Sequence, residues 1–166
     1  MRITSPDEII LQTHSSAILE DMDLIVELSR NCKLRVHISI EGDRDTLPGL
    51  PPPPCSVADR IRTLEQLSSR GIFTVSCLSP LYPLNDANQF FSKIKSAGTS
   101  AIIIDHFILG DGTSDGSRTK NSSLPSIMEN VAPESIHLSY RDVVIDIARK
   151  YLPVGISATG FAGNYS

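Results

Sequence analysis

The feature that most constrains the fold is the alternation of short apolar strands with amphipathic helices. Residues 36–86 contain one complete example: a buried strand, a Pro-rich loop, a capped helix, a second strand and a second Pro-rich loop. Strands that alternate with helices form parallel sheets with right-handed connections. Ligands of such folds bind at the carboxyl ends of the strands. The alternation therefore predicts an α/β protein with its site at that end.

The same alternation extends along the whole chain of 166 residues, which has the size of a single domain, 1–166. Hydrophobic spacing and capping residues predict strands at 9–12, 35–40, 72–78, 101–105 and 153–157, and helices at 18–30, 56–71, 86–98 and 139–150. Four consecutive prolines at 51–54 exclude a helix or a central strand there. Five strands fit either an open doubly wound sheet or part of a (β/α) barrel, and the pattern alone does not choose between them.

Two segments carry little regular pattern. Residues 110–125 are polar and rich in Gly and Ser, which predicts a mobile surface loop or a lid. The last residues, ATGFAGNYS, predict no element.

Composition and charge disfavour several classes of protein. The net charge of -4 gives no basic surface for nucleic acid, so a nucleic-acid partner is not expected. The apolar runs are too short to span a membrane, and the first residues, MRITSPDEII, do not form a signal peptide. We therefore expect a cytoplasmic protein that does not bind membranes.

Cysteine and glycine patterns exclude several kinds of site. Cys32, Cys55 and Cys77 form no CxxC or CxxxCxxC motif, so we expect three reduced thiols and no metal site. No GxGxxG, P-loop or G-x-S-x-G motif is present, and no lysine lies within a predicted strand. A Rossmann nucleotide site, a serine hydrolase and a Schiff-base aldolase are all disfavoured.

Polar side chains gather where the second predicted strand ends. His37, Ser39 and Glu41 share one face because side chains alternate along a strand, and Asp43 and Arg44 continue the polar row. A polar row inside a parallel sheet is costly unless each group is paired or meets solvent or ligand. Two interpretations stay open: a buried hydrogen-bonded network, or a wall that faces a ligand.

The ends of two other strands also carry polar residues. Thr13, His14 and Ser15 follow the first strand, where hydroxyl groups either bind a ligand carboxylate or cap the next helix. Asp105 and His106 end the fourth strand and would point to opposite faces, so they do not form a ready acid–base pair.

Three segments resemble radical S-adenosylmethionine proteins of the group related to spore photoproduct lyase and the DNA-repair-photolyase-like proteins. They read ILQTHSSAILEDMDLIVEL, VHISIEGDR and PPPPCSVADRIRTLEQLSSRGIFTVSCLSPLYPLND. Their order and spacing follow the family from Ile9 to Ile104, which is well over half of the chain. The specificity lies in that order, because each motif alone is only moderately specific.

The resemblance implies a partial, TIM-like (β/α) barrel that binds S-adenosylmethionine across its strand ends. It also implies a [4Fe-4S] cluster held by CxxxCxxC, and reductive cleavage of S-adenosylmethionine to a 5′-deoxyadenosyl radical. This sequence has no CxxxCxxC motif and so supplies no cluster ligands. The chain therefore looks like the later strands of the barrel, without the first one or two βα units, and is not expected to be catalytic alone.

The resemblance assigns cofactor-binding positions and leaves the catalytic residues unknown. Ser39 matches the strand serine that faces S-adenosylmethionine, and Thr13 and Ser15 match a T-x-S strand end. Glu41 continues the row of residues that would face the ligand. Arg60 matches an arginine in a helix of the family, and a structural salt bridge is the alternative to a binding role for it.

Missing strands would leave an open sheet edge, which predicts a homo-oligomer or a complementary N-terminal barrel half as partner. Two other functions stay open. One is a stand-alone α/β module that binds a small molecule. The other is a cluster-free TIM-like enzyme that uses Glu41, Asp43, Asp105 and His106.

Overall fold

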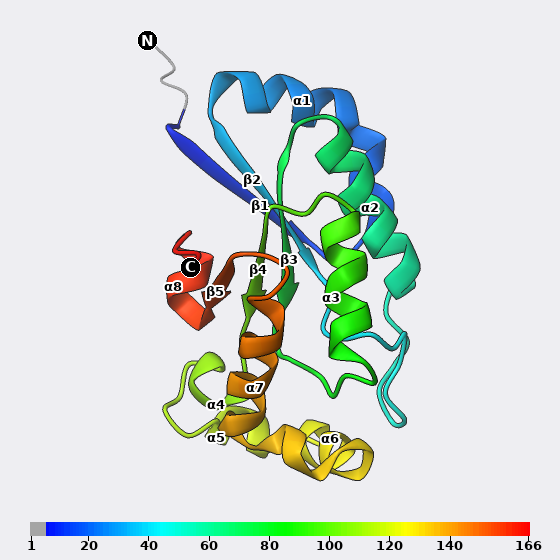
Figure 1. Ribbon diagram of the computed structural model, residues 1–166, viewed down its shortest axis with the longest axis vertical. Helices are drawn as coiled ribbons and strands as arrows, with labels where there is room; N and C mark the ends of the chain where they lie inside the picture. The colour runs from blue at the N-terminus through cyan, green and yellow to red at the C-terminus, as the bar shows by residue number, and fades with distance from the viewer. Residues whose placement is uncertain (1–5) are drawn as a thin grey trace.

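A computed structural model describes residues 6–166 of the chain. Its centre is an open sheet of five parallel strands, ordered β1 to β5 across the sheet (Figure 1). The strands are β1 (Glu8–Thr13), β2 (Lys33–Ser39), β3 (Phe73–Leu78), β4 (Ala101–Ile104) and β5 (Val154–Ile156). Each strand pairs with the next in sequence. A doubly wound sheet reverses its strand order at a switch point, and this sheet does not.

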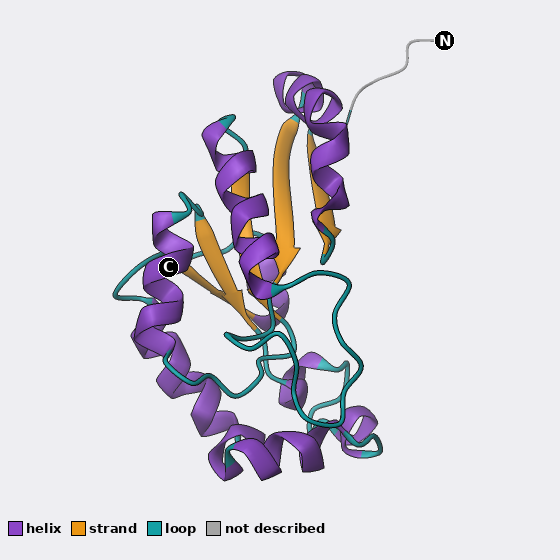
Figure 2. Cartoon of the chain, turned by 90° about the vertical axis from the view of Figure 1, so that its right-hand side faces the viewer, coloured by secondary structure: helices purple, strands orange, loops and turns teal. Residues whose placement is uncertain are grey.

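Four helices cover one face of the sheet, which we call the helix-covered face (Figure 2). They are α1 (Met22–Asn31), α2 (Val57–Ser69), α3 (Ala87–Ser96) and α7 (Leu138–Ala148). Their apolar stripes meet alternate strand residues such as Val36, Ile38 and Ile102, all fully buried. The main hydrophobic core therefore lies between the helices and this face.

Local signals set the bounds of α2 and α3. The Ser56 hydroxyl accepts a hydrogen bond from the Asp59 N–H at 3.0 Å, and the Asp86 carboxylate accepts one from the Gln89 N–H at 2.9 Å. Gly71 and Gly98 follow the two helices with φ of 77°. These caps confirm the predicted helix starts and the predicted glycine stops.

The opposite face, which we call the inner face, is covered by the C-terminal end of the chain. Helix α8 (Ser157–Phe161) lies on this side of the sheet (Figure 1). Phe161 and Tyr165 pack against a small apolar cluster of strand residues: Val75, Cys77, Ala101 and Ile103. Gly160 touches the backbone of Gly155 so closely that a Cβ on Gly160 would lie 2.6 Å from the Gly155 carbonyl carbon. Two glycines thus let α8 sit directly on the sheet.

The two edges of the sheet differ. At the outer edge of β5, Val154 and Ser166 exchange two backbone hydrogen bonds of 2.9 and 3.1 Å. The Thr159 hydroxyl donates to the Ile156 carbonyl at 2.8 Å. Within residues 6–166, β1 has β2 as its only neighbour in the sheet.

Two segments of the structure differ from the prediction, one in the helix expected at 18–30 and one in the loop expected at 110–125. The helix expected at 18–30 begins with a 3₁₀ helix, η1 (Ser16–Asp21), before α1 starts at Met22. The stretch after β4 contains α4 (Phe107–Gly110), α5 (Ser117–Lys120), α6 (Leu124–Val131) and η2 (Pro133–Ile136). Asp111 organises it, because its carboxylate accepts bonds from the N–H groups of Thr113 and Thr119 at 2.9 and 2.8 Å. The mobility of 110–125 stays a prediction.

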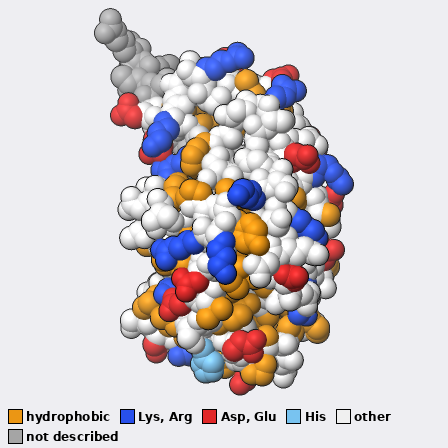
Figure 3. Space-filling view, in the orientation of Figure 1, with side chains coloured by type: hydrophobic (Ala, Val, Ile, Leu, Met, Phe, Trp, Pro, Cys, Tyr) orange, Lys and Arg blue, Asp and Glu red, His pale blue; other side chains and the backbone are white. Residues whose placement is uncertain are grey.

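Surface and length features add two findings. No helix in the described part of the chain has the length and apolarity needed to cross a bilayer. On the face shown in Figure 3, Lys and Arg side chains are interspersed with Asp and Glu side chains.

Candidate functional site

A pocket of about 330 Å³ lies at the carboxyl ends of the first three strands, under the Pro-rich loop. Its walls come from the strand-end segments and from the start of α2. The lining residues are His14, Glu41, Arg44, Asp45, Thr46, Leu47, Leu50, Pro51, Pro52, Pro53, Pro54, Arg60 and Tyr82. The pocket therefore combines apolar walls with a few charged groups, as small-molecule sites do.

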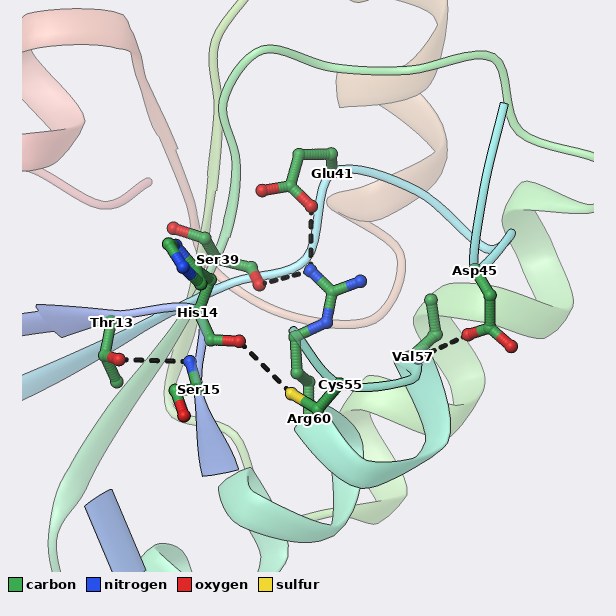
Figure 4. A network of polar contacts seen from close by, with 9 residues as sticks. All are labelled: Thr13, His14, Ser15, Ser39, Glu41, Asp45, Cys55, Val57 and Arg60. Carbon is green, nitrogen blue, oxygen red and sulfur yellow. Dashed lines mark hydrogen bonds and ion pairs between the residues drawn. The ribbon is translucent and has the colours of Figure 1, made fainter. Parts of the chain in front are cut away.

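Arg60 and Glu41 form the best-defined polar contact of this pocket (Figure 4). One terminal nitrogen of Arg60 donates to a Glu41 carboxylate oxygen at 2.8 Å and to the Ser39 carbonyl at 2.9 Å. Arg60 is 2% exposed, whereas the Glu41 side chain is 22% exposed. A buried guanidinium thus fixes a carboxylate that solvent can still reach.

The environment of this pair favours hydrogen bonding to a ligand. The second carboxylate oxygen of Glu41 points away from Arg60 (Figure 4). Burial, with the nearby charge of Glu41, raises the pKa of Tyr82, so its hydroxyl stays protonated as a donor. Tyr82 was not among the predicted site residues. The signal that could have pointed to it is its place in the loop that follows a predicted strand.

Thr13 and Ser15 use their hydroxyl groups within the turn after β1. The Thr13 hydroxyl accepts from the Ser15 N–H at 3.0 Å, and the Ser15 hydroxyl accepts from the Ala17 N–H at 3.2 Å. These bonds match the interpretation in which the hydroxyl groups cap the helix that follows β1 and do not bind a ligand carboxylate. His14, between them, lines the pocket, and its carbonyl accepts a hydrogen bond from the Cys55 thiol at 3.2 Å.

The polar row on β2 divides between two environments. His37 is fully buried on the inner face, its ring centroid 6.1 Å from that of Phe161. Neither ring nitrogen has a hydrogen-bond partner among residues 6–166. Burial, with the charge of Arg35, lowers the pKa of His37 to about 4, so the ring is neutral. His37 therefore belongs neither to a satisfied network nor to the pocket.

The acidic residues beyond Glu41 hold the loops in place. Both carboxylate oxygens of Asp43 accept from the Asn85 N–H, at 2.9 and 2.8 Å, and one accepts from the Asp86 N–H at 2.9 Å. Asp45 accepts from the Val57 N–H at 2.6 Å, at the start of α2. These contacts join the loop after β2 to the starts of α2 and α3.

Asp105 and His106 lie apart from the pocket and contact different neighbours. The Ser79 hydroxyl donates to Asp105 at 3.1 Å, and the other Asp105 oxygen is buried without a partner. His106 Nδ1 accepts from the Ile108 N–H at 3.1 Å, and its Nε2 lies 2.9 Å from the Ser135 carbonyl. Neither residue lines the pocket that contains Glu41.

The three thiols occupy separate places. Cys32 follows α1, Cys55 lies in the Pro-rich loop, and Cys77 is buried in β3. No group of three His, Cys, Asp or Glu side chains in the described residues is arranged to hold a metal ion. The residues present therefore do not fit a [4Fe-4S] cluster.

A larger groove of about 710 Å³ runs between α2 and α3 on the outside of the helix layer. Asp43, Asp45 and Asp86 on its wall already accept bonds from backbone N–H groups. The smaller pocket has the buried arginine and lies at the strand ends, so we take it as the candidate site.

Comparison with known proteins does not extend these observations. No family model matches the chain, and no curated protein matches it.

Proposed function

We propose that this chain is a small-molecule-binding partial (β/α) barrel, related to radical S-adenosylmethionine proteins. It binds S-adenosylmethionine at the carboxyl ends of β1, β2 and β3. The observation that carries the proposal is the Arg60–Glu41 pair in the pocket under the Pro-rich loop. The proposal assigns binding and no reaction, because residues 6–166 offer no group of side chains that fits a cluster.

The topology supports the barrel part of the proposal. The strands follow one another in sequential order, and α1, α2, α3 and α7 all lie on one face. Consecutive βα units of a (β/α) barrel have this arrangement, with helices outside and ligands at the carboxyl ends of the strands. On this proposal, the open sheet of five parallel strands is part of such a barrel.

The chemistry of the pocket supports the ligand. S-adenosylmethionine carries a sulfonium and an ammonium group, and a fixed carboxylate complements a cationic group that lies beside it. Glu41 would supply this carboxylate, and Arg60 would position it through the 2.8 Å ion pair. The pocket of about 330 Å³ lies within the range of small-molecule sites.

Isothermal titration calorimetry of the purified chain tests this proposal. We expect saturable binding of S-adenosylmethionine without added iron, and weaker binding of S-adenosylhomocysteine, which lacks the sulfonium charge. Glu41→Gln should weaken S-adenosylmethionine binding about tenfold or more, since it removes a charge-assisted contact. Glu27→Gln, at an exposed position on α1, is the matched control. Absence of binding to folded protein would refute the proposed ligand.

The outer edge of β1, which pairs with no other strand in the part of the chain that the structure describes, supports the partner part of the proposal. An unpaired parallel strand presents a row of backbone groups that another strand can pair with. The partner would be a second copy of the chain or a complementary N-terminal barrel half. Light scattering that shows a monodisperse monomer would argue against pairing between copies.

A further inference from the structure

We propose that residues 157–166, which comprise α8 and the tail, form a hinged cover that controls access to the inner face of the sheet. The cover turns about Ser157, and its opening exposes His37 and Cys77, which lie buried beneath it when it is closed. No residue of the cover lines the pocket under the Pro-rich loop, so the device is separate from the proposed ligand site.

The hinge is a residue held in an unfavourable backbone conformation. Ser157 joins β5 to α8 with φ of 45°, a left-handed value that costs free energy for a residue with a Cβ. Its hydroxyl is buried and has no hydrogen-bond partner among residues 6–166. Both penalties disappear when the segment turns away from β5, because φ relaxes and water reaches the hydroxyl.

The surface beneath the cover contains polar groups that the cover does not satisfy. His37 is fully buried, the Phe161 ring lies 6.1 Å from its ring, and neither ring nitrogen has a partner in the described part of the chain. Arg35, on the same face of β2, likewise has a buried Nε without a partner there. Water can bond to these groups only in the open state, so their burial favours opening.

The contacts that hold the cover closed are a small apolar contact and a polar latch. Phe161 and Tyr165 pack against the small apolar cluster of the inner face. The Tyr165 hydroxyl accepts a hydrogen bond from Arg35 at 3.2 Å, and Ser166 exchanges backbone bonds of 2.9 and 3.1 Å with Val154. A segment with so little apolar contact belongs to the parts of a protein that open without global unfolding.

Alkylation of Cys77 in the folded full chain measures this opening. The thiol is fully buried in the cluster that Phe161 covers, so it reacts only when the cover opens or the whole chain unfolds. In a background of Cys32→Ser and Cys55→Ser, labelling by N-ethylmaleimide with intact-mass spectrometry reports this thiol alone. We expect a labelling rate that changes little at low urea concentrations, because local opening exposes little surface, whereas global unfolding depends steeply on urea.

Two matched tyrosine variants in the same background test the latch. Tyr165→Phe removes the hydroxyl that accepts from Arg35 and keeps the ring, so it should raise the labelling rate about fivefold. Tyr151→Phe removes a hydroxyl that donates to Asn88 at 3.1 Å, outside the cover, and should leave the rate unchanged.

Two variants of Ser157 test the hinge. Ser157→Gly and Ser157→Ala both remove the buried hydroxyl, but only glycine adopts φ of 45° without strain. The closed state is therefore more stable in Ser157→Gly, which should label more slowly than Ser157→Ala.

Three results would each overturn the hinged cover. They are labelling of Cys77 only through global unfolding, equal rates for Tyr165→Phe and Tyr151→Phe, and a rate for Ser157→Gly that is not below that of Ser157→Ala. Urea denaturation followed by circular dichroism verifies that every variant is folded under the labelling conditions. The measurement contains no ligand, so its result is distinct from that of the calorimetric test of the proposed function.

Discussion

The two faces of the sheet bury their side chains in different ways. On the helix-covered face, Val36 and Ile38 meet four helices and form a continuous apolar core. On the inner face, Arg35 and His37 alternate with them along the same strand and are covered by a five-residue helix and the tail. The first face is held by many apolar contacts, whereas the second buries Arg35 and His37, whose ring nitrogens have no partner among the described residues. Stability therefore comes mainly from the first face.

The largest expected loss of stability follows from a substitution in the core on the helix-covered face. Ile38→Ala should lower the free energy of unfolding by about 2–5 kcal/mol, because it leaves a cavity in a fully buried part of the core. Urea denaturation followed by circular dichroism measures this change. Val143→Ala, at a position 58% exposed on α7, is the control and should shift stability by no more than about 0.5 kcal/mol. If Ile38→Ala lowered the free energy of unfolding no more than Val143→Ala does, the comparison of the two sheet faces would be contradicted.

The next largest effect is a pH dependence of stability that arises from His37 on the inner face. Unfolded histidine protonates near pH 6.5, whereas folded His37 stays neutral down to about pH 4. The unfolded chain therefore binds more protons in this range, so stability should fall as the pH is lowered from 6.5 to 4. The slope from this one group is at most about 1.4 kcal/mol per pH unit. Urea denaturation at several pH values measures it.

His37→Leu separates this contribution from other titrating groups. The variant should lose the His37 part of the slope, and its stability at pH 7 should match or exceed that of the natural chain because an unpartnered polar group is removed. His137→Leu, at an exposed position, should keep the slope. Identical pH profiles for the natural chain and His37→Leu would show that burial of His37 is not maintained in solution.

The smallest effect tests how firmly α8 covers the inner face. Gly160→Ala places a Cβ against the Gly155 backbone, which cannot move as a side chain can. We expect a loss of about 1–3 kcal/mol and faster hydrogen exchange confined to residues 157–166 and the inner face. Ala158→Ser, exposed on the same helix, is the matched control. Exchange that rises equally in α2 and α3 would show that α8 is not a separate unit.

Elements with local signals could be predicted from the sequence. The strands are marked by apolar runs, and α2 and α3 by the caps Ser56 and Asp86 and the glycines that follow each helix. Helix α8 has no such signal, because its position depends on the contact of Gly160 with Gly155. The sequential strand order likewise goes with the packing of α1, α2, α3 and α7 on one face, which strand and helix spacing alone does not determine.

The site was predictable in part for the same reason. Arg60 forms a salt bridge with Glu41, which is the structural alternative expected for this arginine, and it donates to the backbone carbonyl of Ser39. The ligand-facing role of the Ser39 side chain stays a prediction. The role of Asp43 depends on backbone N–H groups more than 40 residues later in the chain, at Asn85 and Asp86. Such a contact exists only once the two loops are folded, so residue type and local spacing could not indicate it.

The unequal edges of the sheet limit the symmetry of any assembly that forms by strand addition. Ser166 and Thr159 occupy backbone groups at the outer edge of β5, whereas β1 stays unpaired within the described residues. Copies that associate through their edges must then pair β1 with β1, about a two-fold axis. Such an isologous contact consumes the free edge of both copies and closes at the dimer. Growth into a fibre would need a second free edge, and the C-terminal residues occupy it.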